Sequence, residues 1–290
     1  MPYWRPRQEP SLSQLSHLSK RRLVSRARLG LSYLAMVMRT EEKVDARWGL
    51  LRTALDAALN FIYPPICQLC GKERAGAHEG YVGGKCWTGV RFVTAPFCER
   101  CGLPYDGDII HPFRCENCAD LEFGFRFARS AVTANAMMLD IIHRYKYHHA
   151  LWFEPFLADL LARQAKSLLT GETWDLIVPV PLHPVKMRER QFNQAERLAR
   201  CLGRSLNLSV NARAVRRVQF TETQTRLSRP QRAANVSDAF APRRGKELHG
   251  ERVILVDDVM TTGATTSACA RALRQAGAGE VCVWTVARGT

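Results

Sequence analysis

The chain has 290 residues, of which 46% are hydrophobic, and a formal net charge of +15 at pH 7. This length allows one sizeable core plus a smaller module. No run reaches the roughly 20 apolar residues that span a bilayer, and no secretory signal stands near the start, so we expect a cytoplasmic protein without membrane insertion. The excess of cations predicts a polyanionic partner, either nucleic acid or a phosphorylated small molecule, unless it is only a basic surface.

Residues 1–60 form a basic N-terminal extension that we expect to be partly helical or disordered. Its second part has apolar residues at helical spacing, which predict a stripe that packs against the next module: Trp48, Leu51, Leu55, Leu59 and Ile62. The part before Arg39 is similar in composition to a transit peptide. An over-extended gene start, with Met36 or Met38 as the first residue, is an equal alternative.

Residues 61–122 carry two matching C-x-x-C-G knuckles, one at Cys67 to Gly71 and one at Cys98 to Gly102. Paired cysteines in a chain without an export signal indicate metal binding rather than disulfides. Thiolates at this spacing hold one side of a tetrahedral Zn²⁺ ion, and glycine suits the turn that follows. A further C-x-x-C pair completes the second knuckle, so we expect a Cys₄ zinc site made by Cys98, Cys101, Cys115 and Cys118.

The first knuckle has an incomplete partner, because the positions expected to answer it hold Gly83 and Cys86. Two alternatives follow. Either His78 supplies the fourth ligand beside Cys67, Cys70 and Cys86, since Cys₃His is a known structural set, or this lobe has lost its zinc and is held by the packing of Trp87, Phe92 and Phe97. Small lobes bury little apolar surface, so bound metal would supply much of their folding free energy.

Residues 123–290 alternate between strand and helix patterns, which predicts an α/β domain with a parallel sheet flanked by helices. Aliphatic runs predict strands at 126–133, 175–181, 210–218, 253–256 and 281–286. Helical patterns cover 137–145, 151–169, 194–206 and 264–276, with Asn193 as an N-cap and Gly277 after the last helix. Between them, residues 219–236 are polar and basic and predict an exposed loop whose Arg and Gln side chains meet phosphates or a partner.

The 175–181 strand is followed by a predicted loop with Lys186, Arg188 and Arg190. If this strand neighbours the 253–256 strand, these cations face the same crevice as the acids described next, at the pyrophosphate end of a ligand. Lys146 lies in the run Y-K-Y-H-H; it is either a surface charge or a further diphosphate contact.

The most informative stretch reads RVILVDDVMTTGAT, from Arg252 to Thr265. A short aliphatic run bounded by charge suits a strand buried on both faces. Asp257 and Asp258 then fall at its carboxyl end, where open α/β sheets bind ligands. The small residues Thr261, Thr262, Gly263, Ala264 and Thr265 begin a helix, whose free N–H groups can hold a phosphate. Adjacent carboxylates accept hydrogen bonds from ribose hydroxyls, so the stretch predicts a phosphorylated-sugar site.

This stretch resembles the phosphoribosyl pyrophosphate (PRPP) motif of type I phosphoribosyltransferases. The resemblance implies that Asp257 and Asp258 hold the ribose 2′- and 3′-hydroxyls, that residues 261–265 bind the 5′-phosphate, and that Mg²⁺ accompanies PRPP. Together with the paired knuckles, R-E-R-Q-F-N-Q at residues 188–194 and A-A-N-V at 233–236, it is similar to the ComF family of competence-associated proteins and to GntX. Gln191 and Gly83 depart from the family pattern.

Two functions follow from this resemblance. The first is a PRPP-binding protein, a glycosyltransferase if active, linked to DNA uptake or to the processing of incoming single-stranded DNA. The second is a non-catalytic protein that uses a degenerate phosphoribosyltransferase fold and its zinc ribbons to bind nucleic acid or to dock a competence helicase. No residue stands out as a general acid or base, and the acceptor is not evident from the sequence.

Overall fold

The computed structural model describes residues 65–289 except 108, 110, 112, 120–121, 170 and 221–237. The predictions for residues 1–60 and for most of the basic loop at 219–236 lie outside these residues. From Pro65 onward the chain forms one compact unit. Within the part described, no helix is long and apolar enough to cross a membrane.

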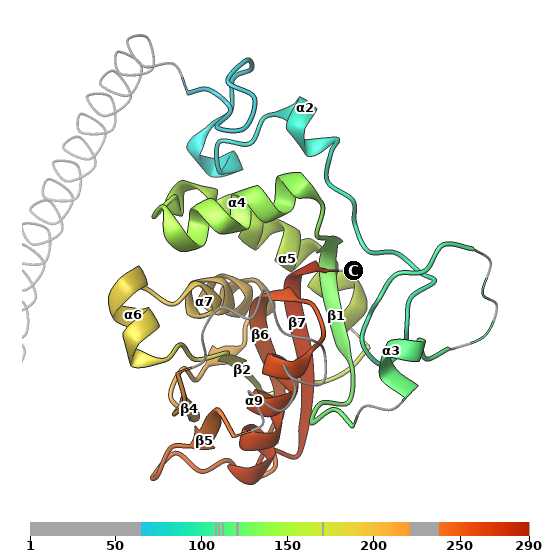
Figure 1. Cartoon of the computed structure of the whole chain (residues 1–290), viewed down its shortest axis with the longest axis vertical. Coiled ribbons are helices and arrows are strands. Elements are labelled where there is room, and N and C mark those ends of the chain that lie inside the picture. Colours follow the sequence, from blue (N-terminus) through green and yellow to red (C-terminus); the bar gives the residue numbers. More distant parts are fainter. Residues whose placement is uncertain are drawn as a thin grey trace, which may run out of the picture. The chain divides into compact units, whose positions relative to one another are not determined.

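Five parallel strands form the central sheet, in the order β1-β7-β6-β2-β3 (Figure 1). The predicted parallel sheet is therefore confirmed. Its two longest strands lie side by side near the middle and are buried along almost their whole length. The strands are β1 (Ala128–Thr133), β2 (Leu176–Pro179), β3 (Ser209–Val210), β6 (Arg252–Met260) and β7 (Glu280–Arg288).

Successive residues of a strand point to opposite faces of the sheet. Helices pack against both faces. In β6, Ile254 and Val256 belong to one apolar core, with α5 and α7, while Val253 and Leu255 belong to the other, with α9. The first core includes α4 as well, and α9 is joined on its side by a small antiparallel pair, β4 with β5. These elements are α4 (Ala136–Tyr147), α5 (Glu154–Leu169), α7 (Gln194–Leu206), α9 (Ala264–Gln275), β4 (Val215–Arg217) and β5 (Phe240–Pro242).

Two predicted elements were wrong in extent. The strand expected at 210–218 is interrupted: after β3 the Asn211 side chain accepts a hydrogen bond from the Arg213 backbone N–H at 2.9 Å, which turns the chain, and β4 then leaves the central sheet. The loop expected after β2 is largely the helix α6 (Pro184–Arg190), whose proline at the first turn is pre-organised for a helix start. The predicted N-cap is confirmed, since Asn193 Oδ1 accepts from the Ala195 N–H at 3.0 Å.

The cysteine-rich segment has short elements only, η1 (Ala77–Glu79), α2 (Gly84–Trp87) and α3 (Glu116–Ala119), and a further turn, η2 (Leu151–Phe153), precedes α5. Residues 91–100 run along the free edge of β1. Thr133 donates its N–H to Arg91 O at 2.8 Å, Val93 donates to Ala131 O at 3.0 Å, and Ala128 donates to Arg100 O at 2.9 Å. This segment covers an edge that would otherwise expose unpaired backbone groups, and it anchors the second knuckle to the sheet.

Candidate functional site

The acid pair lies where the sheet topology favours ligand binding. β2 and β6 are parallel neighbours, with Pro179 opposite Val256, so the condition stated for the 175–181 and 253–256 strands is met. From β2 the chain passes through α6 and α7 to β3 on one side, whereas from β6 it passes through α9 to β7 on the other. The carboxyl ends of β2 and β6 therefore form a topological switch point, where open α/β sheets bind their ligands.

Asp257 and Asp258 are inside the last half of β6 rather than after it, because the strand continues to Met260. Both are buried, with 9% and 3% of their surface exposed. Lys146, in the last turn of α4, places its Nζ 2.7 Å from Asp258 Oδ2. The Asp258 N–H donates to Asp257 Oδ1 at 2.9 Å. Lys146 therefore forms an ion pair with Asp258, one member of the acid pair.

Burial raises the pKa of Asp257 to about 7, and repulsion from Asp258 adds to this, while Lys146 opposes it. Lys146 forms its direct ion pair with Asp258, whereas the raised pKa is that of Asp257. Burying two carboxylates side by side costs free energy unless hydrogen-bond donors face them. A ligand that offers hydroxyl donors would relieve this cost.

Beyond the acids, Gly263 adopts a φ of +79° as the N-cap of α9. The positive φ favours glycine, whereas a Cβ there would meet only the flexible end of Met260, at 2.8 Å, and the Phe123 ring, at 3.1 Å. Thr262 Oγ1 accepts from the Ala264 N–H at 3.4 Å. The Thr261–Thr265 segment is partly exposed at a helix start, with N–H groups that have no partner inside the helix.

The other predicted cations differ in their surroundings. Arg190 is buried and donates to Gln194 Oε1 at 3.1 Å and to Tyr147 Oη at 2.8 Å. Lys186 pairs with Glu189 at 2.9 Å, and Arg188 is exposed on the same helix. Among the described residues, no ion pair joins Lys186, Arg188 or Arg190 to the acids, so their pyrophosphate contacts stay a prediction.

Arg217 is a site neighbour to which the sequence assigned no role. Burial lowers the pKa of its guanidinium, and the Asp257 carboxylate partly restores it. Its proximity to Asp257 arises because β4 leaves the central sheet and packs beside α9. The sequence could not show this, since it predicted an uninterrupted strand there.

The second knuckle forms the expected thiolate quartet from Cys98, Cys101, Cys115 and Cys118, all buried. Neighbouring Sγ atoms lie 3.5 to 3.9 Å apart. A tetrahedron with Zn–S bonds of about 2.3 Å has an edge of about 3.8 Å, so the quartet fits zinc. Burial opposes ionisation of Cys98, but backbone N–H donors, led by Cys115 at 3.3 Å, lower its pKa to about 7.

The first knuckle corrects the prediction for His78. The three cysteines Cys67, Cys70 and Cys86 do come together, but the fourth candidate ligand is Glu73, and no described atom of His78 belongs to the cluster. A Cβ on Gly83 would lie 2.3 Å from Glu73 Cδ. The glutamate side chain thus fills the space that a cysteine at 83 would need. Zinc also takes carboxylate ligands, so these residues fit a Cys₃Glu site. Trp87 nearby packs edge-on against Phe156, with ring centroids 5.1 Å apart, so the apolar packing of the alternative is present too.

Arg288, at the end of β7, joins the two candidate sites. It is buried, and its Nε donates to Cys101 O at 3.1 Å. Another nitrogen of the same guanidinium donates to Met260 O at 3.1 Å and to Thr261 O at 2.6 Å. One side chain therefore holds both the second knuckle and the start of the Thr261–Thr265 segment.

Comparison with known proteins agrees with this two-part organisation. A double zinc ribbon domain matches residues 58–121, and a phosphoribosyl transferase domain matches residues 192–289. Competence protein F of Haemophilus influenzae is 33% identical over 199 residues, which is 67% of this chain and 85% of the relative. DNA utilization protein YhgH of Salmonella typhimurium is 30% identical over 229 residues, 78% of this chain and 97% of the relative.

A solved structure of adenine phosphoribosyltransferase from Thermoanaerobacter pseudethanolicus is 17% identical and covers 50% of this chain and 83% of its own, with a TM-score of 0.30. The fold assignment rests on the strand order and the domain match.

Proposed function

The chain belongs to the ComF family of competence and DNA utilization proteins, and on that premise we propose that it binds PRPP at the Asp257–Thr265 site and acts in the handling of incoming single-stranded DNA. The observation that carries the PRPP proposal is the buried acid pair at the switch point of the sheet, directly followed by a glycine-capped helix start. A phosphorylated pentose offers hydroxyls to the first and an anion to the second.

In this proposal each group of residues has one role. Asp257 and Asp258 accept hydrogen bonds from the ribose hydroxyls, and residues 261–265 hold the 5′-phosphate through backbone N–H groups and threonine hydroxyls. Lys146, Arg190, Lys186 and Arg188 supply positive charge for the pyrophosphate. Mg²⁺ would accompany PRPP and neutralise part of its negative charge.

A transfer reaction at this site would depend on positioning and electrostatics. The sugar would carry cationic character as pyrophosphate leaves, and the neighbouring carboxylates would stabilise it. In this proposal the zinc ribbons take the place of the hood with which phosphoribosyltransferases select their acceptor. PRPP binding can be tested without an acceptor, whereas a transfer reaction needs one.

Calorimetric titration of the zinc-loaded protein with PRPP and Mg²⁺ tests binding directly. We expect saturable binding in the wild type, loss of it in Asp257→Ala, and no loss in Asp159→Asn, which removes an exposed carboxylate paired with Arg163 on α5. Equal binding by Asp257→Ala would refute the proposed site. Pyrophosphate release with candidate acceptors then decides between a transferase and a binding protein.

The alternative is a non-catalytic nucleic-acid-binding or partner-docking protein. It is favoured by the names of the relatives, which refer to competence and DNA utilization, and by the net charge of +15. This alternative requires salt-sensitive binding of single strands that survives Asp257→Ala. The two functions are compatible, since they use different residues.

A further inference from the structure

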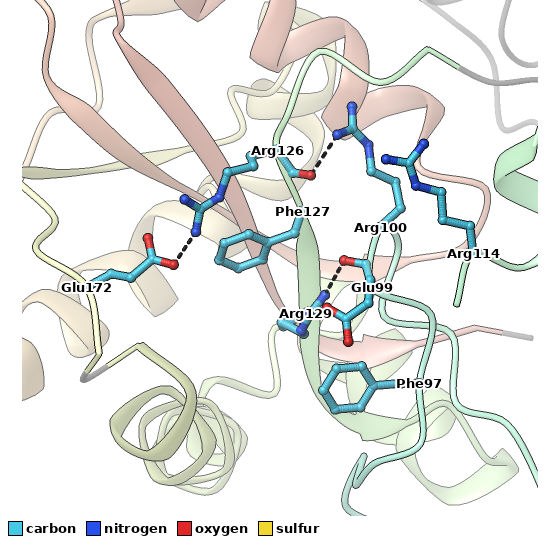
Figure 2. A pocket seen from close by; sticks show the side chains of 8 residues that line it. All are labelled: Phe97, Glu99, Arg100, Arg114, Arg126, Phe127, Arg129 and Glu172. Carbon is cyan, nitrogen blue, oxygen red and sulfur yellow. Dashed lines mark hydrogen bonds and ion pairs between the residues drawn. The ribbon is translucent and has the colours of Figure 1, made fainter. Parts of the chain in front are cut away.

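A cavity of about 500 Å³ lies between the second knuckle and the start of β1 (Figure 2). We call it the arginine pocket. Figure 2 shows Arg126 and Arg129 on one strand segment, with Arg100 and Arg114 on two separate stretches of ribbon beside it. The pocket is lined by Phe97, Glu99, Arg100, Arg114, Arg126, Phe127, Arg129 and Glu172.

The arginines on the β1 side are held rigidly by stacking. The Arg129 guanidinium lies 4.5 Å from the Phe97 ring centroid and 4.9 Å from that of Phe127. Arg126 lies 4.8 Å from the same Phe127 ring. Phe97, Arg129, Phe127 and Arg126 thus contact one another in that order, alternating ring and guanidinium. Such contacts fix the arginines without neutralising them.

Charge in the pocket is only partly compensated. Its lining has four arginines and two glutamates. Arg126 pairs with Glu172, and Arg129 pairs with Glu99 at 3.2 Å. Arg100 donates instead to two neutral carbonyls, Arg126 O at 2.9 Å and Phe123 O at 3.0 Å. Among the described residues, neither Arg100 nor Arg114 forms an ion pair.

Arg100 and Arg114 line the same pocket, next to the cysteine quartet of the second knuckle, whose thiolates supply part of the compensating charge. No carboxylate of the described residues pairs with either guanidinium. Both side chains can therefore contact an anion from solvent.

A second cavity of about 500 Å³ adjoins the arginine pocket, because Arg100 and Arg126 line both. It adds Arg271 and Arg274 from α9 together with Glu122 and Glu280, of which Glu280 pairs with Arg126 at 3.1 Å. It also contains the stacked rings of Phe123 and Phe125, 4.7 Å apart. Two adjoining basic pockets offer more than one phosphate position. This favours a polymer with repeated phosphates over a single small anion.

The two pockets are separate from the PRPP site. They gather at the amino ends of the parallel strands, beside Arg126 before β1 and Glu280 at the start of β7. Asp257 and Asp258 stand near the opposite, carboxyl end of β6. None of the residues proposed for PRPP lines either pocket.

We propose that the arginine pocket and its neighbour bind the phosphodiester backbone of single-stranded DNA, with Arg100 and Arg114 as principal phosphate contacts. This inference rests on the proposed role in handling single strands. Arg114 and Arg126 are exposed, and Phe97, Phe123 and Phe127 are half-buried beside them. Cations next to aromatic rings are the combination that binds single strands without reading their sequence.

The test is the fluorescence anisotropy of a labelled oligothymidylate of about 20 nucleotides, titrated with zinc-loaded full-length protein at several salt concentrations. Arg100→Gln/Arg114→Gln is compared with Arg163→Gln/Arg200→Gln, which removes the same charge from exposed ion pairs on α5 and α7. Each phosphate contact on a single strand contributes about 0.7 to the slope of log K against log salt, so the pocket variant should lose about 1.4 in slope and about 25-fold in affinity at 0.1 M salt.

Zinc content and the melting temperature verify that each variant folds, since Arg100 lies inside the second knuckle. Arg100→Lys/Arg114→Lys keeps the charge and should retain most of the affinity. If both Gln variants bind as the wild type does, or both lose affinity equally, the pocket is not the site. If the wild type binds no oligonucleotide, the inference is overturned as well, whereas the PRPP titration decides the other proposal independently.

Discussion

The buried acid pair predicts an unusual dependence of stability on pH. The pKa of Asp257 is raised from 3.8 to about 7 by burial and by Asp258. At about 1.4 kcal/mol per pKa unit, this disfavours the ionised folded state by about 4 kcal/mol. Between these two pKa values the folded chain keeps a proton that the unfolded chain has lost, so the stability contributed by this group falls as pH rises and levels off above about 7.

Replacing Asp257 with asparagine removes this titration with little change in shape. We expect Asp257→Asn to gain stability over the wild type as pH rises, by about 3 kcal/mol between pH 5 and pH 8. Urea unfolding at several pH values, with zinc present throughout, measures the difference between the two proteins, and other titrating groups cancel in it. The same variant should lose PRPP binding, so the site exchanges stability for function.

Asp159→Asn is the matched control, because its carboxylate is partly exposed and paired with Arg163. Its difference from the wild type should stay within about 0.5 kcal/mol over the same pH range. A flat difference for Asp257→Asn as well would mean that its carboxyl ionises normally, and the description of a desolvated acid pair would be wrong.

Three further changes test other parts of the structure. Lys146→Met breaks its ion pair with Asp258, whose two side chains are 19% and 5% exposed. It should lower the free energy of unfolding by about 3 to 5 kcal/mol at pH 8, because Asp258 is left buried and unpaired. Lys146→Met/Asp258→Asn should recover part of this loss, and additive effects of the two substitutions would contradict the pairing. Glu73→Ala should remove a carboxylate ligand and lower the zinc content from two ions toward one per chain. Adding Gly83→Cys should restore the zinc content and increase the thiolate-to-metal absorption of the Co²⁺-substituted protein. An unchanged zinc content in Glu73→Ala would exclude Glu73 as a ligand. Chelation of zinc should unfold the second knuckle and expose its thiols to a thiol reagent, and retention of the knuckle's proteolytic resistance without metal would show that packing alone holds it.

Much of the fold follows from local sequence patterns. The β6 run is aliphatic because both faces of the strand are buried, and that buried position is what the pattern predicts. Asn193 is recognisable as an N-cap since capping depends on one side chain and its nearest amides. The cysteine quartet of the second knuckle is likewise a matter of spacing.

What the sequence could not give depends on contacts between distant residues. Glu73 fills the space beside Gly83 only once the first knuckle has folded, so a search by cysteine spacing directed attention to His78 instead. The sequence left Lys146 as either a surface charge or a diphosphate contact, and only the packing of α4 brings it to Asp258. Arg217 approaches Asp257 because β4 leaves the sheet, a change of direction set by an Asn turn within an otherwise strand-like run.

Arg288 contacts both the proposed zinc site and the proposed sugar-phosphate site. Because its guanidinium holds the Cys101 carbonyl together with those of Met260 and Thr261, losing either neighbour should loosen the other. If zinc raises the affinity for PRPP, thermodynamic reciprocity requires that PRPP raises the affinity for zinc by the same free energy. Measuring zinc transfer to a chromophoric chelator with and without PRPP, in the wild type and in Arg288→Lys, would reveal whether cellular zinc supply sets when this protein can engage its phosphorylated ligand.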